Sequence, residues 1–379
     1  MELMPPASGV QPQPHATFVG QSGSASSTAA TQHCTCSSLN DFGAAVLACV
    51  DRTATQRVIP LTDEELEARI EQADVPYQFE LGTTGVRLRF AFVSLRGHYP
   101  DEPDKANQDT YKMVPSFGGD HSKILLGVFD GHGAAGDLAA QFVRDNVEDT
   151  LLKLSSRRGS DFQQAYKMTF VQLNQRLQQQ THIDSSLSGT TACAAFLDGD
   201  MLHVANVGDS RAVLGAVRAA PGGSALTIVP IPLSTDQTPY RADERARVRA
   251  MGGLVMSYSQ LLGDAPMHDD WDMDLGAETD LSGDPPRVWE PDTQRPGCAF
   301  TRSIGDWTAE AIGVIAEPEI TSRRLEDTDR FLVVASDGVW EFLTNDDVVE
   351  MTCAYANPLY ASTSRPFMHL PTITTTSPV

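Results

Sequence analysis

Several features that would restrict the function are absent from this sequence of 379 residues. It has no run of about 18 or more apolar residues, and its opening MELMPPASGV lacks the basic-then-apolar order of a secretory signal. The second residue is Glu2 rather than the glycine that N-myristoylation requires, and the C-terminal TTTSPV has no cysteine for prenylation. These absences predict no membrane contact and a cytoplasmic or nuclear location, or both.

Cysteine is scarce, and its spacing excludes two further classes. The chain has no paired CxxC motif and far too few cysteines for a disulfide scaffold. We therefore expect reduced thiols, with Cys193 and Cys298 buried. The six cysteines are Cys34, Cys36, Cys49, Cys193, Cys298 and Cys353.

Basic residues are also few, since 50 acidic side chains stand against 28 basic ones and give a formal net charge of -22. This balance argues against nucleic-acid binding, which needs Lys and Arg to neutralise phosphates. The acidic excess serves solubility in the simpler interpretation. In the sharper one, some carboxylates gather around cations.

The composition divides the chain into three parts. Residues 1–55 are rich in Ser, Ala, Thr, Pro and Gln, which predicts a disordered tail, and 356–379 lose all periodicity, which predicts an irregular tail. The domain between them, 56–355, has an acidic stretch at 254–296 that we interpret as a surface loop or as a mobile flap beside a site.

Hydrophobic periodicity predicts both helices and strands within that domain. TDEELEARIEQAD (62–74) has the capping-box start of a helix, and 137–154, 161–182 and 242–253 have helical spacing. Residues 87–97 alternate as a strand does. Residues 190–217 read as three strands joined by turns at Asp198-Gly199-Asp200 and Gly208-Asp209-Ser210, which predicts antiparallel hairpins.

The stretch GVFDGHGAAG (127–136) fits the dinucleotide-binding pattern G-x-G-x-x-G, but its surroundings do not. That fold needs a second strand ending in an acidic residue about 20 positions later, and here a helix covers that distance. Asp130, at the end of a buried strand, would repel a pyrophosphate. Mg²⁺ or Mn²⁺ instead prefers carboxylate and carbonyl oxygens, which makes Asp130 and the carbonyl of Gly131 candidate ligands.

Acidic residues recur at strand ends and turns in KANQD, VFDGHG, VGDSR, SIGD and ASDGVWE. Together with SGTTA, their order and spacing from about 85 to 350 resemble the metal-dependent protein phosphatase family, the protein phosphatase 2C type of serine/threonine phosphatase. RGHYPDEPDKANQD is similar to the large plant and protist members.

The resemblance implies an α+β fold, an α-β-β-α sandwich of two antiparallel sheets flanked by helices, with two Mn²⁺ or Mg²⁺ ions at one end and a third, weaker one. It also implies phosphorylated protein substrates and a monomer. The implied metal positions are Asp130 as bridging ligand, Gly131 as carbonyl ligand, Asp337 at the first metal, Asp109 as the residue that orders metal water, and Asp209 and Glu341 at the third metal.

Two cations about 4 Å apart would activate a water for attack on the phosphate, so no protein nucleophile is needed. His132 is placed by the motif to donate a proton to the departing serine or threonine oxygen. For SGTTA and SIGD we favour structural roles, in which Ser188, Thr190 and Thr191 form hydrogen bonds near the sheet ends and Asp306 fixes a loop.

The chain departs from the family pattern at three places. Gln108-Asp109 replaces an acidic pair, and Asp104 stands where an arginine usually grips the substrate phosphate, which leaves Lys105 or Arg96 as substitutes. No closing Asp-Asn motif follows Met351, so we expect a C-terminally incomplete domain that binds its first metal weakly. The alternatives to an active phosphatase are a pseudophosphatase that binds phosphoproteins or a partner, and a structural metal-binding module.

Overall fold

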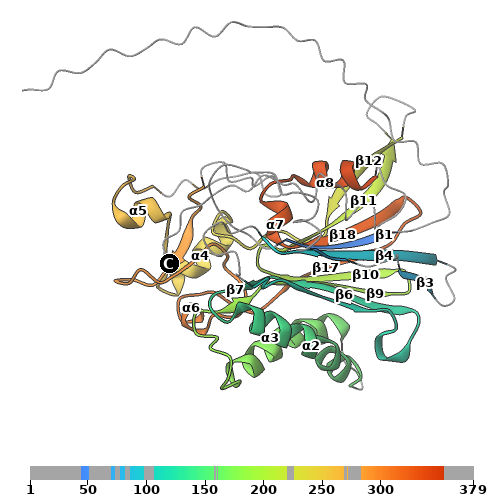
Figure 1. Cartoon of the computed structure of the whole chain (residues 1–379), viewed down its shortest axis with the longest axis horizontal. Coiled ribbons are helices and arrows are strands. Elements are labelled where there is room, and N and C mark those ends of the chain that lie inside the picture. Colours follow the sequence, from blue (N-terminus) through green and yellow to red (C-terminus); the bar gives the residue numbers. More distant parts are fainter. Residues whose placement is uncertain are drawn as a thin grey trace, which may run out of the picture. The chain divides into compact units, whose positions relative to one another are not determined.

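The computed structural model describes residues 44–50, 70–72, 77–81, 86–97, 106–157, 159, 161–219, 226–268, 271 and 283–353. Two β-sheets lie face to face, with helices α2 (Gly136–Ser155) and α3 (Phe162–Gln178) outside one of them (Figure 1). Helices α7 (Asp337–Trp340) and α8 (Asn345–Cys353) lie on the side of the other sheet. The predicted α-β-β-α sandwich is confirmed.

The sheet covered by α2 and α3 is antiparallel throughout. Apolar side chains on α2 and α3 pack against it, and buried Tyr166 donates a 2.7 Å hydrogen bond to the carbonyl of Ala194. In spatial order its strands are β17 (Glu319–Arg324), β10 (Met201–Val207), β9 (Ala192–Asp198), β6 (Lys123–Phe129) and β5 (Thr110–Val114).

The other sheet is mixed and not antiparallel as predicted, because its central strand β1 runs parallel to both neighbours, β18 and β4. The remaining pairs are antiparallel. Its strands, in spatial order, are β12 (Leu226–Pro232), β11 (Arg211–Ala219), β18 (Asp329–Ala335), β1 (Ala44–Val50), β4 (Val86–Leu95) and β2 (Ile70–Gln72), with β3 (Tyr77–Leu81) also paired to β4.

Strand β1 corrects the prediction that all of 1–55 forms a disordered tail. The run AAVLACV is uninterruptedly apolar, and pairing on both sides satisfies its backbone hydrogen-bonding groups within the sheet. The rest of 1–55 lies outside the described residues, as do 354–379, on which the predicted C-terminal tail falls.

Two further predictions are corrected by the strand pairing. The Asp198-Gly199-Asp200 turn does close a hairpin between β9 and β10, but β10 and β11 belong to different sheets, so Gly208-Asp209-Ser210 is a crossover between the sheets. Within TDEELEARIEQAD, residues Ile70–Gln72 form strand β2 rather than helix, because they pair with β4. The remainder of that segment is not among the described residues.

Apolar clusters fill the layers of the sandwich. The cluster between the two sheets includes Phe90, Leu126 and Val334, all of which are buried. Another lies between the mixed sheet and α8, where Trp340 and Val348 are buried. Truncating one such large side chain to alanine costs about 2–5 kcal/mol, so these clusters contribute a large part of the stability of the sandwich.

The predicted acidic flap is in part regular structure. Strands β13 (Leu254–Met256), β14 (Arg287–Trp289) and β15 (Pro296–Cys298) form a small antiparallel sheet. It packs with α4 (Ala242–Ala250) and α6 (Trp307–Glu310) around a separate apolar cluster. Helix α5 (Tyr258–Leu262) begins at a Ser257–Gln260 capping box. Residues 269–270 and 272–282 are outside the described part.

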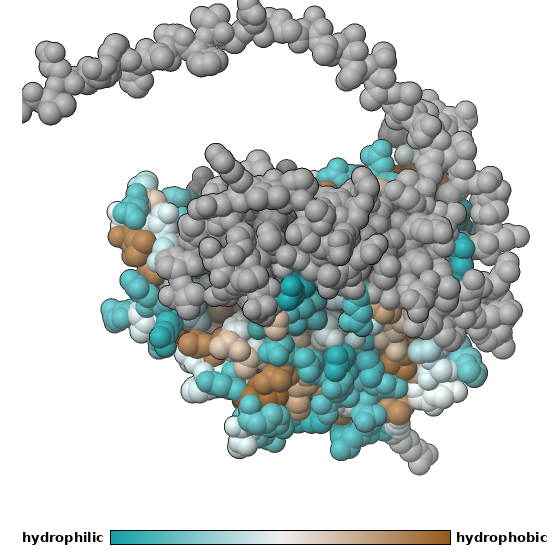
Figure 2. All heavy atoms as spheres, in the orientation of Figure 1, coloured by the Kyte–Doolittle hydropathy of each residue, from teal (hydrophilic) through white to brown (hydrophobic). Residues whose placement is uncertain are grey.

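The remaining short elements are η1 (Phe117–Gly119), β7 (Gly131–His132), β8 (Gly189–Thr190) and β16 (Ile304–Gly305), the last three forming a sheet of their own. Figure 2 shows a largely hydrophilic face, with hydrophobic residues at the left end where Figure 1 places α5, which carries the half-exposed Leu262. No helix in the described ranges is long and apolar enough to cross a bilayer.

Candidate active site

A cleft of about 370 Å³ brings together most of the acidic residues that the sequence singled out. Asp130, Asp209 and Asp337 line it, together with the backbone of Gly131 and the side chains of His132 and Asp306. These residues are far apart in the sequence. Their meeting in one cleft is therefore a product of the fold.

The sandwich explains why these three carboxylates meet. Asp130 directly follows β6, and Asp337 follows β18 after one intervening residue. Asp209 lies on the crossover that leaves β10 and enters β11. The strands belong to two sheets that lie against each other, and each delivers its aspartate at the same end of the sandwich.

The glycines of GVFDGHGAAG are required by close backbone packing. A Cβ on Gly131 would lie 2.3 Å from the carbonyl oxygen of Gly136. Gly133 has φ +79°, a left-handed conformation that side chains disfavour, and a Cβ there would lie 2.3 Å from the carbonyl oxygen of Leu187. The motif thus shapes a turn between β6 and α2 and holds the Asp130–His132 segment against its neighbours.

His132 has a defined partner in the cleft. Its Nε2 lies 2.7 Å from Oδ2 of Asp306, which is 2% exposed and also accepts a 2.6 Å hydrogen bond from the hydroxyl of Ser303. The imidazole ring lies 4.4 Å from the Phe300 ring, centroid to centroid. These contacts fix the direction in which the imidazole faces.

The charges around His132 favour its protonated form. Burial, the largest single effect, lowers the pKa of the imidazole, and the Asp306 carboxylate raises it by charge and hydrogen bonding. The Asp209 and Asp337 carboxylates act in the same direction. The net result is a pKa above the ordinary value of 6.5.

SGTTA has the structural role that the sequence predicts. The hydroxyl of Ser188 accepts from the backbone N–H of Ala135 at 3.0 Å. The hydroxyl of Thr191 accepts from the backbone N–H of Asp130 at 3.2 Å and lies 2.7 Å from the hydroxyl of Ser210, next to Asp209. Thr191 therefore couples the two segments that carry Asp130 and Asp209. Thr190 is buried and bonds the carbonyl of Thr191.

Asp109 is buried beside the cleft, where its Oδ2 accepts a 2.8 Å hydrogen bond from the hydroxyl of Ser336, the residue before Asp337. Gln108 lines the cleft and donates from Nε2 to the carbonyl of Gly133 at 2.7 Å. This contact points the amide nitrogen toward the turn.

Among the described residues, the predicted site residues Asp109, Glu341 and Arg96 do not line the cleft. Glu341 follows α7, and its backbone N–H bonds the carbonyl of Asp337 at 2.8 Å, so it lies one helical turn further along. Arg96 is described and partly buried, but it does not line the cleft. Lys105 lies outside the described residues.

The donor set fits a hard divalent cation. Carboxylates and a backbone carbonyl are the ligands that Mg²⁺ and Mn²⁺ prefer, and several carboxylates in one cleft repel one another unless a cation neutralises them. Within the described residues, no three cleft carboxylates bring ligand atoms within 4.8 Å of one another. The type of donor, rather than its spacing, is therefore the observation that fits these cations.

Two contacts in the cleft were missed from the sequence. Arg287 on β14 lines the cleft and donates from Nη1 to the carbonyl of Gly297 at 3.0 Å, so it places a cation among the carboxylates. Asp306 was predicted to fix a loop, and its contact with His132 adds a second role. The acidic SIGD motif was a signal for Asp306, whereas no motif marked Arg287.

Comparisons with known proteins show which sequences this chain resembles. A model of the protein phosphatase 2C family matches residues 101–360. The chain is 45% identical over 270 residues to "Probable protein phosphatase 2C 35" of Arabidopsis thaliana, covering 71% of this chain and 74% of that protein. It is 32% identical over 267 residues to "Probable protein phosphatase 2C 48" of Oryza sativa subsp. japonica, covering 65% and 69%.

A solved structure supports the fold in the same way. The crystal structure of serine-threonine phosphatase 2C from Toxoplasma gondii resembles this one with a TM-score of 0.55 and 18% sequence identity. The match covers 84% of this chain and 91% of that one. At this level of identity the likeness concerns the arrangement of the sandwich alone.

Proposed function

The chain belongs to the protein phosphatase 2C family of metal-dependent serine/threonine protein phosphatases, and from this premise we propose that the cleft hydrolyses phosphoserine and phosphothreonine in proteins with two Mn²⁺ or Mg²⁺ ions. One observation carries the proposal. Asp130, Asp209 and Asp337 arrive from three separate strand ends in a single cleft that also contains His132. A sandwich has no packing reason to collect like charges at one end.

The roles of the acidic residues follow from their positions. Asp130, the carbonyl of Gly131 and Asp337 would hold the cations, with Asp109 behind Ser336 and Asp209 across the cleft as further oxygen donors. When bound, the cations would lower the pKa of a water, making it nucleophilic, and neutralise phosphate oxygens. Thr191 keeps the backbone of Asp130 in register with the Asp209 turn.

His132 is the proton donor in this proposal. A serine or threonine alkoxide is a poor leaving group and needs a proton as the P–O bond breaks. Asp306, 2.7 Å from Nε2, orients the imidazole and favours its charged form. The Phe300 ring, tilted by 40° against the imidazole at 4.4 Å between centroids, limits rotation of the imidazole.

Arg287 is the candidate phosphate contact. It contributes a guanidinium to a cleft lined by carboxylates, and its bond to the carbonyl of Gly297 holds one end of that group. Guanidinium groups bind phosphate through paired N–H donors. Arg287 thus fills, from the β14 side, the role for which the sequence suggested Lys105 or Arg96.

A pseudophosphatase that binds phosphoproteins without hydrolysing them is the second candidate. The observation that favours it is the wide spacing of the cleft carboxylates, none of which forms a three-residue ligand group in the described part of the chain. The neutral Gln108 beside Asp109 also favours a pseudophosphatase, because a neutral ligand binds Mg²⁺ less well than a carboxylate.

One experiment separates the two candidates. The wild type, Asp130→Asn and Asp161→Asn are incubated with a phosphothreonine peptide and Mn²⁺, and phosphate release is measured. Asp161 caps α3 and does not line the cleft, and asparagine caps equally well, so this variant should keep full activity. We expect hydrolysis by the wild type and a loss of about 100-fold or more in Asp130→Asn. Peptide binding without phosphate release in the wild type would favour the pseudophosphatase.

A further inference from the structure

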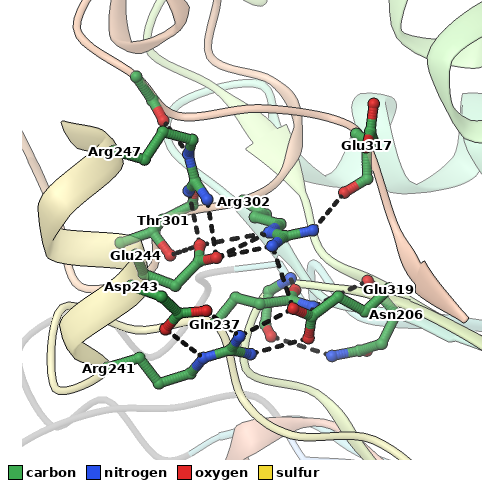
Figure 3. Close-up of polar contacts among 12 residues, drawn as sticks. Asn206, Gln237, Arg241, Asp243, Glu244, Arg247, Thr301, Arg302, Glu317 and Glu319 are labelled. Atoms are coloured by element: carbon green, nitrogen blue, oxygen red, sulfur yellow. Dashed lines mark hydrogen bonds and ion pairs between the residues drawn. The ribbon is translucent and has the colours of Figure 1, made fainter. Parts of the chain in front are cut away.

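A network of arginines and carboxylates lies beside the segment that carries Asp306. Its members are Arg241, Asp243, Glu244, Arg247, Arg302 and Glu319, which we call the arginine–carboxylate network (Figure 3). It joins α4, the segment after β15 and the start of β17. None of its members lines the cleft.

Glu244 is the centre of the network and is 1% exposed. Arg247 binds both of its oxygens, at 2.7 Å and 2.5 Å. Arg302 donates to Oε1 at 2.6 Å from Nη2 and to both oxygens at 3.2 Å from Nε. The hydroxyl of Thr301 donates to Oε2. One carboxylate therefore fixes two consecutive residues, Thr301 and Arg302.

Arg302 is held from its other side as well. Its Nη1 donates to the carbonyl of Glu317 at 2.8 Å, and Nη2 lies 3.1 Å from the Glu319 carboxylate. Figure 3 shows the guanidinium between these groups and Glu244. A planar guanidinium with partners on several edges has a single allowed position, which a lysine could not reproduce.

The backbone of this segment is anchored too. The N–H of Thr301 donates to the carbonyl of Gln237 at 2.7 Å, and Arg247 donates to the carbonyl of Thr301 at 2.9 Å. Gln237 is fully buried and accepts from the N–H of Gly208 at 2.7 Å, one residue before Asp209. The same anchors therefore hold the neighbours of a second cleft residue.

Asp306, whose carboxylate contacts His132, is only four positions after Arg302 in the sequence. Ser303, next in sequence, donates its hydroxyl to Oδ2 of Asp306, and the same oxygen lies 2.7 Å from Nε2 of His132. Asp306 has φ +51°, an uncommon conformation for a residue other than glycine, so neighbouring contacts must maintain it. The path from Glu244 to His132 consists of hydrogen bonds and one short stretch of backbone.

The three acidic members also satisfy the geometry of a cation site, since Asp243, Glu244 and Glu319 bring ligand atoms within 4.8 Å of one another. Their oxygens already bind arginines: Arg241 pairs with Asp243 and Glu319, and Arg247 and Arg302 pair with Glu244. The guanidinium groups supply the positive charge there. This cluster is therefore a structural ion-pair network.

From these contacts we propose that Glu244 and Arg302 are positioning residues for the proton donor, which they hold in place through Ser303 and Asp306. This inference rests on the proposed function, in which His132 protonates the leaving oxygen. It predicts a specific kinetic defect, because proton donation matters only when the leaving group is a strong base. An alkoxide needs the proton, whereas nitrophenolate, a much weaker base, departs without it.

The test compares Glu244→Gln and Arg302→Lys with wild type on a phosphothreonine peptide and on p-nitrophenyl phosphate, both with Mn²⁺. We expect kcat on the peptide to fall about 10-fold or more and kcat on p-nitrophenyl phosphate to change less than about threefold. Asp329→Asn is the matched control. It breaks a buried ion pair of similar geometry with Arg323, 3.0 Å apart, at the opposite end of β18 from Asp337. We expect it to leave the ratio of the two kcat values unchanged.

Equal losses on both substrates, or no loss on either, would overturn the inference while leaving the phosphatase assignment intact. A second measurement does not depend on activity. In ¹⁵N-histidine NMR spectra, the His132 signal is identified by its disappearance in His132→Asn. We expect it to shift or broaden in Glu244→Gln and to stay in place in Asp329→Asn. If the wild type hydrolyses neither substrate, the proposed function is wrong. If the His132 signal does not move in Glu244→Gln, the positioning role is wrong, whatever the activity of the wild type.

Discussion

Replacing Glu244 with glutamine should lower the stability of the protein at neutral pH and remove part of its sensitivity to acid. Glu244 is buried, which raises its pKa, but hydrogen bonds from Arg247, Arg302 and Thr301 outweigh burial and lower the pKa from 4.5 to about 2. Glutamine has nearly the same size but no charge. The substitution therefore leaves two guanidinium groups without their anion.

The lowered pKa of Glu244 determines both the sign and the size of its contribution to the unfolding free energy as pH changes. A carboxylate whose pKa is lower in the folded state stabilises that state above the unfolded pKa, and the stabilisation disappears as pH falls through the folded pKa. For Glu244 the window runs from about 4.5 down to about 2. The stabilisation amounts to about 3 kcal/mol at neutral pH, and about 2 kcal/mol of it is lost between pH 5 and pH 3.

Urea unfolding of the wild type and Glu244→Gln at several pH values between 3 and 7 measures this directly. We expect the difference in unfolding free energy to be constant above pH 5 and to shrink by about 2 kcal/mol at pH 3. Glu148→Gln is the control, since Glu148 forms a partly exposed ion pair with Lys112, 3.3 Å apart, of the kind that contributes about 0–1 kcal/mol.

A difference that stayed the same from pH 7 to pH 3 would refute this reasoning. It would mean that the pKa of Glu244 is similar in the folded and unfolded states, so the arginines would not hold the carboxylate in its charged form. The same conclusion would follow if the difference in unfolding free energy from wild type changed with pH as little in Glu244→Gln as it does in Glu148→Gln.

Three further predictions concern single side chains. His132→Asn should lower kcat on a phosphothreonine peptide about 100-fold or more and affect p-nitrophenyl phosphate much less, and equal losses would exclude a proton-donor role. Arg287→Met should raise KM for the peptide about 10-fold through loss of a phosphate contact, whereas an unchanged KM would place the phosphate elsewhere. Tyr166→Phe should reduce the unfolding free energy by about 1–3 kcal/mol, because it leaves the buried carbonyl of Ala194 without this donor, and thermal unfolding would show whether it does.

Local sequence patterns predicted the elements that carry the site. An apolar run followed by Asp-Gly marks the ends of β6 and β18, and both aspartates reach the cleft. The reason is physical: a buried strand must be apolar along its length, so a carboxylate at its end marks the edge of the core. The helices after Asp130 and before the 254–296 stretch also follow from periodicity alone.

Pairing between distant segments could not be predicted in this way. AAVLACV lies among polar, low-complexity sequence, and its partners β4 and β18 are about 40 and 285 residues away in the chain. The Gly208-Asp209-Ser210 turn was recognisable as a turn, yet nothing within it tells a hairpin from a crossover between sheets. The pairing of β1 and the course of the chain after β10 both depend on which strand edges the rest of the fold leaves open for pairing.

The contacts between side chains in the site also depend on pairing between distant segments, so the sequence could not predict them. His132 and Asp306 are 174 residues apart in sequence, and their 2.7 Å contact arises only because β7, β8 and β16 form one small sheet. Arg287 enters the cleft from a stretch that looked like a solvated acidic loop. Motif spacing can identify ligand types, but the orientation of a proton donor depends on contacts that only the fold creates.

The central claim is that the cleft aspartates hold cations that hydrolyse a phosphomonoester. The most direct measurement is phosphate release from a phosphothreonine peptide as Mn²⁺ is titrated, with calorimetry of Mn²⁺ binding to the same samples of wild type and Asp130→Asn. The account predicts turnover that rises with Mn²⁺ occupancy in the wild type, and loss of both binding and turnover in Asp130→Asn. Turnover that does not depend on Mn²⁺, or that survives in Asp130→Asn, would contradict it.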